Sequence, residues 1–233
     1  MNPSEPTPLH CRPEAFETLA DELDALDTTR GLVRCAVAVS MHELDTTGPD
    51  EVEARLDALA ASIAQRLSSD QPRAVLAHAH AVLFDEAGFT GDTEDYYHPR
   101  NSYLACILDK KQGLPITLAL IYKAVLETLG LETRGINAPG HFLAAVRDHP
   151  DKPRVLIDPF HGGKLLTREE AFTRIETIAG GSVIRDDALL RPASHVEWLV
   201  RIIQNLVAAF DRLGRRDDMA AMTEMRTLVE SVR

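Results

Sequence analysis

The chain has 233 residues, of which 45% are hydrophobic and 26% charged, a composition typical of a folded globular protein with a sizeable core. Its net charge of −11 at pH 7 argues against a general nucleic-acid binder and against a protein that binds anionic membrane surfaces. The N-terminus lacks the basic and apolar segments of a signal peptide, and no apolar run approaches the length of a membrane span, so we expect a cytoplasmic protein.

The N-terminal region, residues 1–87, is predicted to be helical after a loose tail at residues 1–10. Apolar residues recur there at spacings of three and four, which predicts helices over about 13–26, 29–44, 50–67 and 72–86. Pro13 and Pro72 begin two of these helices, since a missing N–H costs nothing in the first turn.

The central helix, about 115–129, is predicted to be buried because apolar residues occupy most of its circumference. Pro115 suits its first turn, and Gly130 suits the left-handed residue just past its end. The residues at the N-terminus of this helix are therefore the first place to look for functional groups.

A polar loop with several aromatic residues, Gly88 to Ser102, comes before the central helix. A short helix follows the loop over about 102–110, and we expect Asn101 or Ser102 to cap it. Aromatic and arginine side chains dominate binding hot spots, so the candidates for a binding surface are Tyr96, Tyr97, Arg100, Asn101, Tyr103 and, at the helix start, Pro115. In the alternative interpretation, this loop packs over the mouth of a cleft in the core.

The periodicity changes from helix to strand after Gly130. Short, partly β-branched runs separated by turn residues predict three antiparallel strands, at Thr133–Ile136, Phe142–Val146 and Arg154–Ile157. The sequence therefore predicts an α+β fold, with a helical N-terminal region and a buried central helix packed on a small antiparallel sheet.

Two capping boxes predict the helices that follow the sheet. Thr167 with Glu170 begins a helix to about Ile178, and Ser194 with Glu197 begins a long helix that ends at Gly214. With a last helix over about 216–231, the long helix resembles one tetratricopeptide-type hairpin, a helical appendage that offers a partner groove. The evenly spaced methionines of the last helix are expected to lie in the hairpin core: Met219, Met222 and Met225. The predicted segments are residues 1–87, 88–192 and 193–233.

Three short motifs combine a helix start at Pro115, a histidine at the head of a strand, His141, and an aspartate at the end of another, Asp158. This is the skeleton of a Cys-His-Asp hydrolase or acyltransferase. Such a site needs a thiolate at a helix N-terminus, an imidazole that takes its proton and a carboxylate that orients the imidazole.

The motifs are similar to those of a known superfamily. The stretches Asp95–Ser102, Gly113–Leu118, Gly140–Phe142 and Ile157–Gly163 resemble the transglutaminase-like superfamily, and most closely its bacterial branch named for the invasion-gene regulator SirB. The resemblance covers nearly all of the chain and implies a papain-like α+β core. It also implies that His141 and Asp158 correspond to the catalytic histidine and aspartate, whereas Pro115 stands where active relatives carry cysteine.

Other side chains of the sequence carry nucleophilic or metal-ligating atoms. The Thr117 hydroxyl lies in the first helical turn, where bonding to the backbone is favoured over attack, and Cys106 is expected to be a buried structural thiol. The cysteines show no CxxC spacing, and the histidines of the core, His98, His141, His149 and His161, show no ligand spacing with Asp95 or Asp158. We therefore expect no metal and no cofactor.

Our leading hypothesis is a non-catalytic transglutaminase-like protein that acts by binding a protein partner or by regulation, with no nucleic acid or membrane as partner. The rival is a hydrolase or acyltransferase on amide or ester bonds that uses His141 and Asp158 with a nucleophile such as Thr117. A third hypothesis is a binder of small molecules or peptide ends that reuses the cleft. A Thr117 hydroxyl within hydrogen-bond reach of His141 and facing an open cleft would favour the rival.

Overall fold

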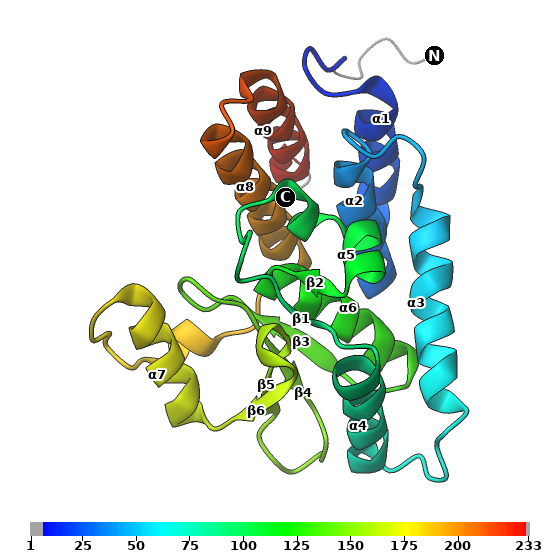
Figure 1. The fold of residues 1–233 in the computed structure, drawn as a ribbon, viewed down its shortest axis with the longest axis vertical. Coiled ribbons are helices and arrows are strands. Elements are labelled where there is room, and N and C mark those ends of the chain that lie inside the picture. The colour runs from blue at the N-terminus through cyan, green and yellow to red at the C-terminus, as the bar shows by residue number, and fades with distance from the viewer. Residues whose placement is uncertain (1–6, 232–233) are drawn as a thin grey trace.

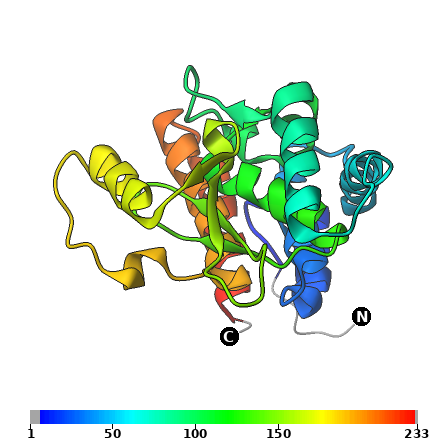
Figure 2. The same ribbon diagram turned by 90° about the horizontal axis from the view of Figure 1, so that it is seen from below.

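The computed structural model describes residues 7–231 and has the predicted α+β architecture, in which one buried helix separates a small sheet from a layer of helices (Figure 1). The buried helix is α6 (Pro115–Thr128), which packs against strands on one side and against helices α2 and α3 on the other. Seen from below, α6 lies in the middle of the molecule (Figure 2). The described helices are α1 (Pro13–Glu22), α2 (Thr29–Ser40), α3 (Pro49–Ala64), α4 (Pro72–His80), α5 (Leu104–Lys110), α6, α7 (Arg168–Ala179), α8 (His195–Arg212) and α9 (Arg216–Ser231).

The main sheet is antiparallel, with neighbouring strands in chain order, which confirms the pairing predicted for the first three. Its strands are β3 (Thr133–Ile136), β4 (Leu143–Val146), β5 (Val155–Asp158) and β6 (Lys164–Leu166). Strand β6 was not predicted, because its three residues are too few to show an alternating pattern. A second, two-stranded parallel pair joins β1 (Thr90–Gly91) to β2 (Gln112–Gly113) and fixes the loop before α6.

Several predicted helices are shorter than expected. The first ends at Glu22 and continues as a 3₁₀ turn, Leu23–Ala25, and the fourth is α-helical only to His80. Residues Ala81–Glu86 form a π-helix, in which the Ala87 N–H donates to the Val82 carbonyl. This wider turn accompanies a cluster of aromatic rings that includes Phe84 and Tyr122, 5.6 Å apart, a contact that sequence periodicity does not encode.

The predicted cap of the short helix before α6 is wrong. Residues Pro99–Ser102 form a 3₁₀ turn, and α5 starts after Tyr103 with no side-chain cap. Both predicted capping boxes are present, at Thr167 with Glu170 and at Ser194 with Glu197.

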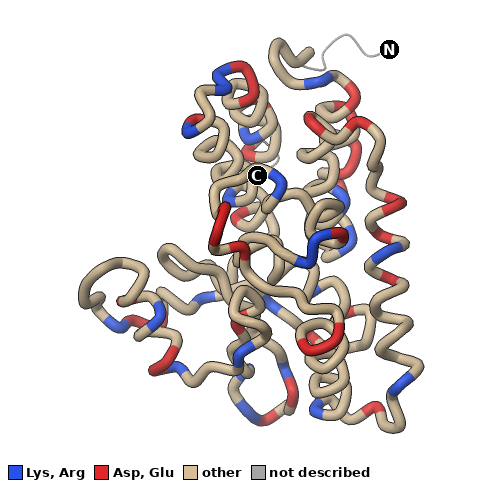
Figure 3. Tube along the Cα trace, viewed as in Figure 1, with Lys and Arg blue, Asp and Glu red and all other residues tan. Residues whose placement is uncertain are grey.

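The main hydrophobic core runs through all three predicted segments, because one cluster of buried residues extends from Cys11 to Val229. Trp198 of α8 is fully buried against β3, where a Cβ on Gly135 would lie 2.2 Å from the indole ring. Met222 and Met225 are buried in the α8–α9 pair, as expected of hairpin core. Acidic and basic residues are interspersed over the elements (Figure 3).

The chain ends also contact one another. The Glu224 carboxylate of α9 accepts hydrogen bonds from the backbone N–H groups of Leu9, His10 and Cys11. The predicted loose tail is therefore held at residues 9–11, and residues 1–6 lie outside the described part of the chain. Among the described residues, no helix combines the length and the apolar character that crossing a membrane requires.

Candidate functional site

The N-terminus of α6 is the point at which the resemblance places a nucleophile. Leu114 is the N-cap in an extended conformation, and Pro115 is the first helical residue and is buried. The Thr117 hydroxyl is fully buried and donates to the carbonyl oxygens of Asn101, at 2.8 Å, and Leu114, at 3.1 Å. Its proton is therefore shared between backbone acceptors of the first turn, and it makes no hydrogen bond to His141.

His141 and Asp158 form the buried pair expected from their positions at strand ends. His141 follows Gly140, whose φ of +70° lets the chain turn into β4, and Asp158 is the last residue of β5. The His141 Nε2–H donates to Asp158 Oδ2 at 2.9 Å, and the two residues are 3% and 0% exposed. Since Nε2 is used on the carboxylate, Nδ1 is the only ring nitrogen left to act as a base.

Two residues that sequence reasoning did not assign to the site complete this cluster. His161, in the turn after β5, places its Nδ1 at 2.8 Å from Asp158 Oδ2, and Arg174 of α7 has its Nε at 3.6 Å from the same oxygen. An Arg174 N–H donates to His161 Nε2 at 2.9 Å. Because arginine only donates, His161 Nε2 must be the acceptor. The ring proton of His161 is therefore on Nδ1, which donates a hydrogen bond to Asp158.

The charges of this cluster have a consistent pattern. Burial would raise the pKa of Asp158, but the hydrogen bond from His141 and the electrostatic interactions with His141, His161 and Arg174 outweigh it and hold the pKa below its ordinary value. Burial lowers the pKa of His161, which agrees with a neutral ring between Asp158 and Arg174. The cluster therefore holds a carboxylate whose counter-charge is Arg174.

Aromatic side chains cover the pair from the side of the loop before α6. The Phe160 ring packs edge-on against His141, with 6.0 Å between centroids, and Tyr96 packs against Phe160 at the same separation. Gly91 makes this possible, because a Cβ there would lie 2.3 Å from the Phe160 ring. Asn101 holds the loop in place by donating to the Asp95 carbonyl at 2.8 Å.

The predicted binding residues divide into exposed and buried groups. Tyr97 is 51% exposed, with the Arg212 guanidinium 3.7 Å above its ring, and Arg100 is exposed. Tyr96 is half-buried, and Asn101 and Pro115 are buried. Asn101, Pro115 and Tyr103 therefore lie inside the protein and not on an exposed surface, and the Asn101 carbonyl accepts from the Leu114 N–H at 3.1 Å, which joins the loop to the helix start.

Three groups that could ligate a metal meet here, although the sequence spacing did not suggest it. One ligand-type atom each from His141, Asp158 and His161 lie within 4.8 Å of one another. Arg174 already provides Asp158 with a cationic neighbour, which opposes a second cation in the same place. Protein groups therefore bond Asp158 and both ring nitrogens of His161, while no hydrogen bond joins His141 Nδ1 to another described residue.

The buried central helix, the antiparallel sheet and the His–Asp pair agree with one family. The profile of the transglutaminase-like superfamily matches residues 50–204, and the chain belongs to this superfamily.

UPF0162 proteins are among the bacterial proteins to which the chain is similar. One from Xylella fastidiosa is 36% identical and covers 83% of this chain and 70% of its own length. One from Pseudomonas aeruginosa is 27% identical over 94% of this chain and 76% of its own. The human F-box only protein 21 is 32% identical over 61% of this chain but only 22% of its own length. No solved structure matches the chain significantly.

Proposed function

We propose that this protein is a non-catalytic member of its superfamily that acts by binding a protein partner or by regulation. The observation that carries the proposal is Pro115 at the first position of α6, where a thiol would be required. Proline offers no nucleophilic atom, whereas the His141–Asp158 pair is retained as a buried contact between strands. In this proposal the histidine and aspartate of a catalytic triad are present, and the nucleophile is absent.

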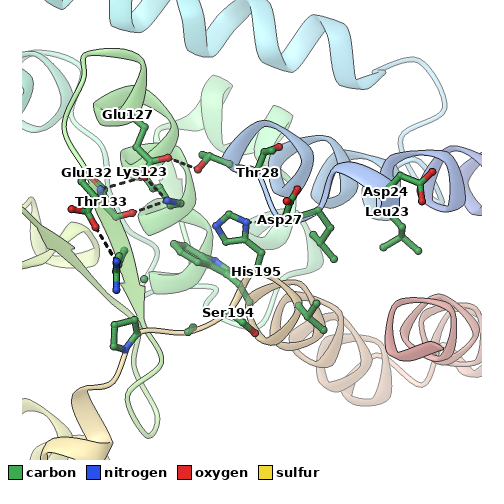
Figure 4. Close-up of a pocket in the computed structure, with 18 residues that line it drawn as sticks. Leu23, Asp24, Asp27, Thr28, Lys123, Glu127, Glu132, Thr133, Ser194 and His195 are labelled. Atoms are coloured by element: carbon green, nitrogen blue, oxygen red, sulfur yellow. Dashed lines mark hydrogen bonds and ion pairs between the residues drawn. The ribbon is translucent and has the colours of Figure 1, made fainter. Parts of the chain in front are cut away.

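The rival, a hydrolase or acyltransferase with Thr117 as nucleophile, requires a base that removes the hydroxyl proton. The Thr117 proton is instead shared by two backbone carbonyls, and the side chain is fully buried. A cavity of about 920 Å³ in the described chain lies elsewhere and includes neither Thr117 nor His141 in its walls (Figure 4). These observations favour the non-catalytic proposal over the rival.

We further propose that the protein is of the SirB-type branch, that its C-terminal α8–α9 pair is of the tetratricopeptide type, and that partner binding uses the junction of this pair with the core. Tyr97 of the loop stacks under Arg212 of α8, and Leu213 beside it is 56% exposed. Exposed tyrosine and arginine in contact are the residue types that dominate binding energy at interfaces.

The partner proposal is tested by affinity capture of the full chain and of the Tyr97→Ala/Arg212→Ala double variant. A matched control is Arg168→Ala, which removes another arginine stacked on an aromatic ring, that of Phe172, on a different helix. We expect recovery of specific partners, quantified by mass spectrometry, to fall at least about tenfold for the double variant only. Equal recovery by all three proteins would remove this surface from the proposal.

A further inference from the structure

Helix α7 covers the face of the main sheet that is turned away from α6. Side chains alternate along a strand, and in β4 Phe142 and Ala144 belong to the main core, whereas Leu143 and Ala145 belong to a second cluster. Ala171 of α7 packs in that second cluster. Figures 1 and 2 show α7 at the edge of the molecule, apart from the other helices. The helix is therefore an outer cover of the sheet.

The apolar side chains of α7 pack separately from the main core. Its three buried residues, Ala171, Phe172 and Ile175, lie in two small clusters with residues of the sheet and of the segment after α7. None of the three belongs to the core around α6. A part of a protein that shares few buried contacts with the rest opens at a lower free energy than the whole. The packing therefore allows α7 to leave the sheet while the main core stays folded.

Arg174 makes the polar contact between α7 and the buried cluster. Its guanidinium donates to His161 Nε2 at 2.9 Å, and its Nε lies 3.6 Å from Asp158 Oδ2. Within the described chain, the other side-chain ion pairs of α7 join it to the segment directly after it: Arg168–Asp187, Glu169–Arg185 and Glu176–Arg185. Since those pairs would move together with the helix, Arg174 is the contact that an opening of α7 must break.

The last turn of α7 lies against the turn that carries His141. A Cβ on Gly140 would be 2.5 Å from Ile178 Cγ2, so the isoleucine packs directly on this turn. The ring of His161, which Arg174 holds, lies 5.8 Å from that of His141. His141 is only 3% exposed, although no hydrogen bond joins its Nδ1 to another described residue. Departure of α7 would remove both Ile178 and Arg174 from the surroundings of this ring.

The segment after α7 has the character of a hinge. Gly180 ends the helix, and residues 181–186 form no regular structure. All six are exposed except Val183, which is half-buried. A rotation of α7 about this segment would therefore disturb little packing before α8 begins at His195.

We propose that α7 is a lid over the His141–Asp158–His161 cluster, latched by Arg174, and that it opens as a unit while the core around α6 stays folded. In the open state, a carboxylate and two imidazoles become accessible from the outer side of the sheet. A ligand or partner that binds this state would select it from the ensemble. The inference is independent of the partner surface proposed at Tyr97 and Arg212.

The first test is hydrogen–deuterium exchange of the full chain at pH 7, followed by mass spectrometry. We expect the amides of α7 to have protection factors at least about tenfold lower than those of α6. Arg174→Gln should lower the protection of α7 about tenfold further, the factor of one lost charge-assisted contact, and leave α6 unchanged. The matched control is Arg185→Gln, because its partners Glu169 and Glu176 lie on α7 itself. It should change the protection of α7 by less than about threefold.

The second test measures the cover over His141. Diethyl pyrocarbonate modifies neutral imidazoles, and peptide mapping reports the rate at each histidine. We expect His141 to react about tenfold faster in Arg174→Gln than in the native chain. Ile178→Ala should also accelerate this reaction, and its fold is retained because the residue is 45% exposed. His195, half-buried at the start of α8, is the internal control and should react equally in all chains.

Several results would overturn the proposal. Equal protection of α7 and α6 in the native chain, or equal losses in both helices on Arg174→Gln, would show a single cooperative unit. An effect of Arg185→Gln as large as that of Arg174→Gln would remove the latch. Faster exchange in α7 without faster reaction at His141 would show that the helix unfolds in place and covers nothing.

Discussion

Asp158 is the residue on which the buried cluster depends. Its carboxylate is fully buried, and it accepts from His141 at 2.9 Å, from His161 at 2.8 Å and lies 3.6 Å from Arg174. A buried charge without such partners would be strongly unfavourable. These contacts bring together the turn before β4, the end of β5 and α7, so the cluster links three parts of the fold.

Replacing this carboxylate tests that role. Asp158→Asn removes the charge that His141, His161 and Arg174 surround and should lower the free energy of unfolding by about 2–4 kcal/mol. The measurement is urea denaturation at pH 7. A loss below about 0.5 kcal/mol, within the range of ordinary surface substitutions, would show that the cluster contributes little.

The same contacts predict the response to acid. The pKa of Asp158 lies below its ordinary value of 3.8 in the folded protein, so its contribution is present above pH 3.8 and is lost as pH falls through the folded pKa. The pKa of His161 lies below 6.5, so the unfolded chain takes its proton first, and stability falls as pH drops below 6.5. The stability difference between native protein and Asp158→Asn should therefore shrink in strong acid. A difference that stays constant down to about pH 2 would contradict this assignment.

Some of the site could be predicted at this scale, and some could not. Pro115, His141 and Asp158 lie at or near the ends of helices and strands, and the turn residues and strand patterns of the sequence predict where those elements begin and end. His161 and Arg174 join them only because of the turn after β5 and the docking of α7, which are tertiary features. A local pattern does not report which helix packs beside a strand end.

At the scale of elements, α6 is the helix around which the sheet and the other helices pack. The His141–Asp158 cluster lies near its beginning, and a cavity lined by Lys123 and Glu127 lies near its end. The burial of α6 followed from apolar residues on most of its circumference, and β3 matches its predicted bounds residue for residue. The π-helical turn was missed because it accompanies contacts with other elements, and β6 was missed because its three residues are too few to show an alternating pattern. The Asn101 cap failed because that side chain bonds the preceding loop instead.

The packing of that loop depends on Gly91. A Cβ at this position would lie 2.3 Å from the Phe160 ring, so Gly91→Ala must displace the ring that covers His141. We expect Gly91→Ala to lower the free energy of unfolding by about 1–3 kcal/mol. Gly48→Ala is the control, since nothing lies within 4 Å of a Cβ there, and should cost less than about 1 kcal/mol. Equal losses in thermal unfolding would contradict the proposed packing.

At the scale of the whole molecule, the C-terminal helix pair is joined to the rest of the chain. Trp198, Leu206 and Phe210 of α8 belong to the main core, and Glu224 of α9 holds the backbone of residues 9–11. The pair therefore acts as part of the scaffold as well as a candidate partner surface.

Removal of residues 193–233 tests this arrangement. Deletion takes Trp198 and its neighbours out of the core, each large buried residue being worth about 3–5 kcal/mol, which approaches the stability of a typical domain. We expect the truncated chain to show no cooperative thermal transition by circular dichroism. A cooperative transition near that of the full chain would show that the pair is dispensable for folding.

The claim that the protein is non-catalytic rests on Pro115, and turnover measures it most directly. Amide, ester and thioester substrates should be screened with the native chain and with His141→Ala, with folding of the variant verified by circular dichroism. We predict no turnover that depends on His141, because no nucleophile stands at the start of α6. Robust turnover by the native chain that His141→Ala abolishes would contradict the account.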